Sequence, residues 1–105
     1  MKTVNVQELK QLIDENQDFQ LIDVREPFEN DLCSLDGNLI PMGEIIVRMD
    51  EIRKDKKVIV LCRSGMRSAN VIRYLEQHHG YSNLFNLTGG ILAWSAEIDP
   101  SMPSY

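Results

Sequence analysis

Long apolar runs, positive charge and cysteine are all scarce in this sequence of 105 residues. No stretch approaches the roughly 18 apolar residues that a membrane-spanning helix needs, so we expect no contact with a membrane. The opening residues carry one positive charge with no apolar segment behind it, which predicts no secretory signal and a cytoplasmic location. The formal net charge is −5, which argues against nucleic acid as a partner because phosphate contacts require a surplus of Lys and Arg.

Only two cysteines, Cys33 and Cys62, and only two histidines, His78 and His79, are present. The cysteines are sufficient in number for one disulfide, but a reducing cytoplasm disfavours it. Neighbouring residues of a helix point about 100° apart, so the two histidines would not face one ion. We therefore expect no structural metal.

The overall composition is that of an ordinary globular protein, with 43% hydrophobic and 26% charged residues. The length fits one domain over residues 1–105. Short apolar runs alternate with helical patterns, which is typical of an α/β fold with a parallel sheet. We expect strands over residues 20–24, 38–40, 57–61 and 84–87.

Helices are expected between these strands. Asn5 lies three residues before Glu8, as in a capping box, and apolar residues follow at helical spacing. Pro27 suits the first turn of a short helix. The apolar residues of 45–52 predict a further helix of about two turns.

The second half of the chain continues the alternation. Apolar residues from Ser68 onward recur at helical spacing, and Gly80 predicts the end of that helix. Gly89 and Gly90 indicate a tight turn into a last helix. Because residues 99–105 contain two prolines, we expect them to be extended.

Cys62 stands at the carboxyl end of the most apolar strand, where open α/β sheets place their ligands. The loop after it runs into a helix N-terminus, where free amides and the helix dipole favour negative charge. Arg63 and Arg67 add two cations, and these influences together lower the pKa of a thiol. Ser64 and Gly65 are small enough to let backbone amides turn toward an anion. These neighbours favour a reactive thiolate over a buried structural cysteine.

The sequence resembles the rhodanese family in three segments: Leu-Ile-Asp-Val-Arg-Glu-Pro at 21–27, Val-Ile-Val-Leu-Cys-Arg-Ser-Gly-Met-Arg-Ser at 58–68, and Gly-Gly-Ile-Leu-Ala-Trp at 89–94. The resemblance implies a rhodanese-like α/β fold, a five-stranded parallel sheet flanked by helices on both faces. It also implies a six-residue loop whose amides hold a persulfide on the catalytic cysteine, Cys62. The substrate-binding residues would be the rest of that loop, Arg63, Ser64, Gly65, Met66 and Arg67.

The implied activity is that of a thiosulfate sulfurtransferase. It would carry sulfane sulfur from a donor such as thiosulfate to a thiol or another thiophilic acceptor, without a cofactor. Residues 31–35 and 97–105 further resemble the rhodanese module of enzymes that adenylate ubiquitin-like proteins in molybdopterin and thiamin biosynthesis. A ubiquitin-like sulfur carrier is therefore a candidate partner. The chain contains no adenylating domain, and residues 33–37 replace a His-Ile-x-Gly-Ala stretch that is common in the family.

Two alternative functions stay open: a non-catalytic rhodanese-like binding module, and a cysteine phosphatase. The presence of Cys62 disfavours the first. Phosphatases of this kind have five residues between the cysteine and the arginine, whereas four residues separate Cys62 from Arg67. A Cys–His hydrolase fails on geometry, because His78 would lie roughly 15 Å along the helix from the sulfur.

Three further residues receive structural roles. Asp23 and Arg25 are two residues apart at a strand end, so their side chains share a face and are expected to form a structural ion pair. The alternative is that they order the catalytic loop through hydrogen bonds. Cys33 is expected to be a structural cysteine, since free cysteine often packs as a small apolar residue. The alternative is a second thiol that resolves the persulfide.

Overall fold

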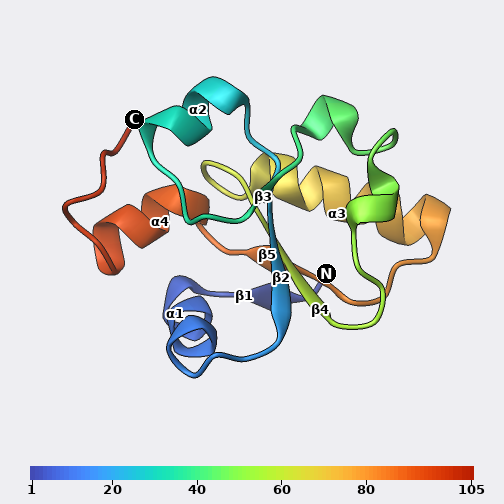
Figure 1. Ribbon diagram of the computed structural model, residues 1–105, viewed down its shortest axis with the longest axis horizontal. Coiled ribbons are helices and arrows are strands. Elements are labelled where there is room, and N and C mark those ends of the chain that lie inside the picture. Colours follow the sequence, from blue (N-terminus) through green and yellow to red (C-terminus); the bar gives the residue numbers. More distant parts are fainter.

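A computed structural model, which describes all 105 residues, has a parallel sheet at its centre (Figure 1). Its five strands lie in the order β1-β5-β4-β2-β3. They are β1 (Thr3–Val4), β2 (Phe19–Asp23), β3 (Asn38–Leu39), β4 (Lys57–Leu61) and β5 (Leu84–Leu87). The helices are α1 (Val6–Asp14), α2 (Pro27–Leu32), α3 (Met66–His79) and α4 (Gly90–Glu97). The predicted α/β fold with five parallel strands is confirmed, and β1 is the strand that the residue pattern did not identify.

The central strand β4 is buried on both faces because its side chains alternate between two cores. Val58 and Val60 pack with α3 on one face, while Ile59 and Leu61 pack with α1 and α4 on the other. A continuous apolar run is therefore required here, as the sequence predicted. No helix of the structure has the length and apolar character needed to cross a membrane.

Helices α1 and α2 begin at the predicted residues. The Asn5 side chain accepts a hydrogen bond from the Glu8 amide at 2.8 Å, and the Glu8 carboxylate accepts one from the Asn5 amide at 2.9 Å. This is the predicted capping box. Pro27 occupies the first turn of α2, where its missing N–H has no partner to lose.

The helix predicted over 45–52 does not form. The chain instead has two short 3₁₀ helices, Met42–Glu44 and Met49–Glu51, joined by a turn. Ile45 and Ile52 are buried and Met49 packs against the same core, so the apolar spacing was real. The β-branched run at 45–47 has low helix propensity, and two of its three side chains are exposed, so nothing offsets that cost.

The tail is not simply extended as predicted. The Met102 amide donates to the Asp99 carbonyl at 3.0 Å, which closes a turn with Pro100 at the position proline prefers. Beyond the turn the chain runs back toward α2, where the last residue lies (Figure 1). The carboxyl ends of β2 and β4 also lie beneath α2, so distant segments meet at this end of the sheet.

Candidate active site

Cys62 directly follows β4, and the five residues after it lead into the first turn of α3. Its side chain is only 1% exposed. The Gly65 amide donates to the Cys62 sulfur at 3.1 Å, and the Ser68 hydroxyl lies 3.3 Å from it. The structure thus brings the predicted loop residues into one tight turn around the sulfur. Its rim is exposed at Arg63, Ser64 and Met66.

The surroundings of the sulfur favour the thiolate. Burial opposes ionisation, but the Ser68 hydroxyl and the backbone amides of Ser68, Gly65 and Ser64 donate hydrogen bonds that outweigh it. The pKa of the Cys62 thiol therefore lies below its ordinary value. A lowered pKa leaves a larger fraction of the sulfur ionised at a given pH, and the thiolate is the more nucleophilic form of cysteine.

Arg67 is held by a partner that sequence reasoning missed. Its guanidinium donates two hydrogen bonds to the Glu29 carboxylate of α2, at 2.7 and 2.8 Å. These bonds lower the pKa of Glu29 to about 2, against the effect of its burial. Hydrogen bonding to Glu29 likewise raises the pKa of Arg67, with a smaller contribution from the negative charge on Cys62. The Arg67 charge is therefore shared between the carboxylate and the sulfur.

Arg63 contacts the tail. Its guanidinium donates to the main-chain oxygen of Tyr105 and lies over the Tyr105 ring. The Tyr105 hydroxyl in turn donates to Glu29 at 2.6 Å. Both arginines of the loop are thus oriented by segments remote in the sequence. The sequence predicted that the loop amides, the helix N-terminus and these two cations together lower the pKa of Cys62, and the largest lowering comes from Ser68 and the loop amides.

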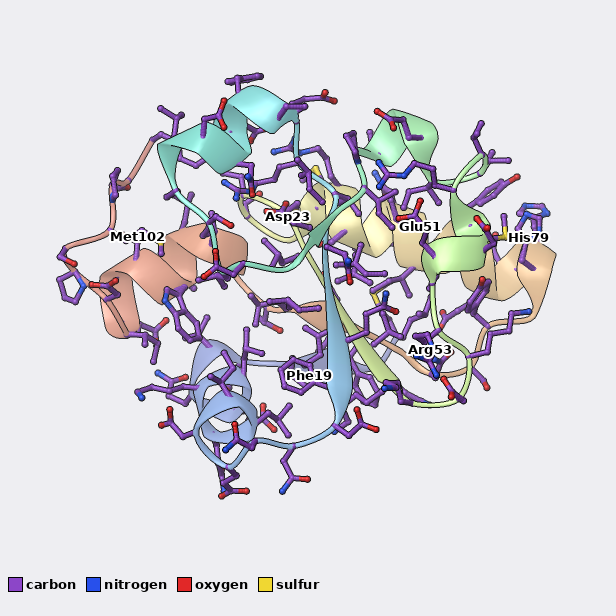
Figure 2. All side chains as sticks on the ribbon, viewed as in Figure 1. Phe19, Asp23, Glu51, Arg53, His79 and Met102 are labelled. Atoms are coloured by element: carbon purple, nitrogen blue, oxygen red, sulfur yellow. The ribbon has the colours of Figure 1, made fainter.

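Asp23 and Arg25 form the ion pair that their spacing predicted. Arg25 is fully buried, and its guanidinium meets the Asp23 carboxylate at 2.7 Å. It also donates to the carbonyls of Glu29 and Cys33 and to the Tyr105 hydroxyl. Burial disfavours the charged form, but the hydrogen bonds to Asp23 and Tyr105 raise the pKa of Arg25. The pair therefore ties α2 and the tail to the carboxyl end of β2, where Asp23 lies (Figure 2).

The two cysteines have different environments. Cys33 packs in the core beneath α1 and α4, whereas Cys62 belongs to the core beneath α3, on the opposite face of the sheet. Both thiols are free. The Arg25 guanidinium lies 3.9 Å from the Cys33 sulfur. This placement supports the structural reading of Cys33.

Gly90 lets the start of α4 pack directly against the Cys62 loop, a role that the sequence did not reveal. The amides of Ile91 and Leu92 donate to the carbonyls of Cys62 and Arg63, at 3.0 and 3.1 Å. Gly90 has φ +59°, and a Cβ atom there would lie 2.4 Å from the Arg63 oxygen. Only glycine allows α4 to approach the loop this closely. The sequence signal was the Gly89–Gly90 pair, for which only a tight turn was predicted.

The histidines lie apart from this site. Figure 2 shows His79 at the far end of α3 from the loop, and both His78 and His79 pack against the Tyr74 ring. No cluster of three or more His, Cys, Asp or Glu side chains is arranged to hold a metal ion.

A model of the rhodanese-like domain family matches residues 5–97. The chain belongs to this family. The rhodanese-like chain is 37% identical to the putative sulfurtransferase YtwF of Bacillus subtilis, over 95% of its own length and 96% of that protein. It is 32% identical to the probable adenylyltransferase/sulfurtransferase MoeZ of Mycobacterium tuberculosis, over 98% of its own length but only 27% of that protein.

The fold of the rhodanese-like chain also matches solved structures. A rhodanese-like domain protein from Staphylococcus aureus superposes with a TM-score of 0.81 at 33% identity, covering 90% of this chain and 91% of that one. The resemblance noted in the sequence, to single rhodanese domains and to the module of adenylating enzymes, is therefore confirmed.

Proposed function

We propose that this rhodanese-like chain is a sulfurtransferase that carries sulfane sulfur as a persulfide on Cys62. The observation that carries the proposal is the Cys62 sulfur at the centre of a turn of amides, with the Gly65 N–H at 3.1 Å and the Ser68 hydroxyl at 3.3 Å. Donors converging on one sulfur stabilise a thiolate and, one bond further out, a persulfide anion. The relationship to the putative sulfurtransferase YtwF supports the same activity.

The proposed reaction has two displacements. The Cys62 thiolate attacks the outer sulfur of a donor such as thiosulfate, the donor S–S bond breaks, and sulfite leaves with the bonding pair. A thiolate or cyanide then attacks the outer sulfur of the persulfide, which leaves as part of a new persulfide or of thiocyanate, and the Cys62 sulfur recovers the electron pair of the broken S–S bond as a thiolate. Neither step needs an oxidant or a general base, and the covalent intermediate predicts ping-pong kinetics.

The decisive experiment assays the purified protein for transfer of sulfur from thiosulfate to cyanide, beside hydrolysis of an aryl phosphate. Cys62→Ser should abolish sulfur transfer. Cys33→Ser is the matched control and should keep most of it, because Cys33 packs on the opposite face of the sheet. Loss of activity in the Cys33 variant alone would contradict the assignment. Phosphate hydrolysis without sulfur transfer would favour the phosphatase, and neither activity would favour a binding module.

We further propose that the acceptor is a protein or a small thiol, with a ubiquitin-like sulfur carrier as the first candidate. The support is the match of nearly the whole chain to part of MoeZ, a probable adenylyltransferase/sulfurtransferase. The test loads the protein with labelled thiosulfate and adds an adenylated carrier and glutathione in competition. Label that reaches the carrier's C-terminus faster supports the specific role. Label that reaches only glutathione refutes the specific role.

A further inference from the structure

Asn86 is a buried polar residue of β5 that the proposed reaction does not use. Its side-chain nitrogen donates to the Gly65 carbonyl at 3.1 Å, and its side-chain oxygen lies 2.6 Å from the Ser68 hydroxyl. The Gly65 amide and the Ser68 hydroxyl are also within hydrogen-bond distance of the Cys62 sulfur, at 3.1 and 3.3 Å. Asn86 therefore closes a ring of hydrogen bonds behind the loop.

The orientation of the Asn86 carboxamide follows from its partners. The Gly65 carbonyl can only accept, so the NH₂ group must face it. The inverted amide would place two acceptor oxygens 3.1 Å apart in a buried site. The Asn86 oxygen therefore faces Ser68, where it too can only accept. The proton of that contact must come from the Ser68 hydroxyl.

Ser68 has one hydroxyl proton and two neighbours that compete for it. The Asn86 oxygen is at 2.6 Å and the Cys62 sulfur at 3.3 Å. When Cys62 is a thiol, its S–H can donate to the Ser68 oxygen while Ser68 donates to Asn86, so every group has a partner. When Cys62 is a thiolate, the sulfur needs a donor. Turning the hydroxyl to the sulfur leaves the buried Asn86 oxygen without one.

We propose that Asn86 is a positioning residue that acts through Ser68 and restrains the ionisation of Cys62, by holding the Ser68 hydroxyl until the sulfur carries a charge. The role in catalysis rests on the proposed function. When the persulfide gives up its outer sulfur, the Cys62 sulfur takes the bonding pair, and the Ser68 hydroxyl turns to meet the new charge. The ring thus returns to its resting arrangement once the thiolate is protonated or loaded again.

The test measures alkylation of reduced Cys62 by iodoacetamide as a function of pH, in a Cys33→Ser background so that one thiol reacts. Ser68→Ala should alkylate about tenfold more slowly below the midpoint, because a hydrogen bond to the thiolate is lost. Asn86→Leu should alkylate several-fold faster, because the Ser68 hydroxyl is released to the sulfur. The double variant should match Ser68→Ala, because the proposed effect of Asn86 on ionisation runs through the Ser68 hydroxyl and not through its bond to the Gly65 carbonyl.

Two matched controls separate this role from general damage. Asn83→Leu removes an amide that donates to the carbonyls of Arg53 and Lys56, and Ser95→Ala removes a hydroxyl that donates to Met102. Both should leave the alkylation profile unchanged. The charged and titratable groups around the loop stay the same in every variant; these are Asp23, Arg25, Glu29, Arg63, Arg67 and Tyr105.

A slower or unchanged Asn86→Leu, or an equal effect of this substitution with and without Ser68, would overturn the proposal. If Asn86→Leu does not fold, a pH titration of the unsubstituted protein followed by NMR still tests the proposal. Its Asn86 side-chain amide resonances should shift with pH at the midpoint of Cys62, and resonances that stay constant through that midpoint refute the ring. Alkylation and amide shifts do not depend on sulfur transfer, so failure of this inference is distinguishable from failure of the proposed function.

Discussion

Replacing Gly90 by Ala should damage the Cys62 loop, and replacing Gly80 by Ala is its matched control. Both glycines have positive φ, +59° and +69°, so alanine meets a similar backbone penalty of about 1–2 kcal/mol at each. They differ in their surroundings. A Cβ atom at Gly80 would meet nothing within 4 Å, whereas one at Gly90 would lie 2.4 Å from the Arg63 oxygen and 2.6 Å from the Cys62 oxygen.

The extra cost at Gly90 follows from what must move. Neither carbonyl can tolerate such a contact, so the loop and α4 must separate. The hydrogen bonds from the Ile91 and Leu92 amides to those carbonyls are then lost, at about 1 kcal/mol each. We therefore expect Gly80→Ala to lower the free energy of unfolding by about 1–2 kcal/mol and Gly90→Ala by about 3–4 kcal/mol.

Two measurements test this expectation. Urea unfolding gives the free energies of both variants, and alkylation of Cys62 at a pH below its midpoint reports the loop. Gly90→Ala should slow alkylation because the sulfur loses its alignment with the amides, while Gly80→Ala should not change it. Equal losses of stability in the two variants, or an unaltered Cys62 in Gly90→Ala, would show that α4 does not support the loop.

Three further outcomes are expected, each measured by urea unfolding. Glu29→Gln should lower the free energy of unfolding at neutral pH, and this loss should shrink as the pH falls from 4.5 toward about 2. The reason is that a carboxyl whose pKa is lowered in the folded protein adds stability above its unfolded pKa, and that stability is lost as the folded carboxyl is protonated. A loss that does not change with pH would contradict the ion pair. Tyr105→Phe removes the hydroxyl from Glu29 and Arg25 and should cost about 1.5–3 kcal/mol, more than Tyr81→Phe, which loses one bond to a neutral carbonyl. Arg25→Lys should cost about 3–5 kcal/mol, since the one nitrogen of an ammonium cannot reach all the partners that three guanidinium nitrogens bind, namely Asp23, two carbonyls and the Tyr105 hydroxyl. A loss below about 1 kcal/mol would refute this reasoning.

The 45–52 segment shows where local patterns stop being sufficient. Its apolar spacing correctly placed Ile45 and Ile52 in the core. The same spacing did not decide the hydrogen-bond pattern, because a short β-branched stretch gains little from forming an α-helix and the core needs only its inward side chains. The tail shows the same limit, since its prolines predicted no helix but did not predict the return of Tyr105 to α2.

The sequence by itself determined the buried strand β4, the capping box at Asn5 and the loop that begins at Cys62. Each of these features depends on residues within a few positions of one another, so the spacing of those residues is sufficient to predict it. Only the tertiary structure decided what surrounds that loop. Glu29, Asn86, Gly90 and Tyr105 come from four separate segments, and packing of those segments at the carboxyl end of the sheet brings them to the loop. Contacts between distant segments depend on how the helices pack on the sheet, which no local pattern of charge or hydrophobicity records.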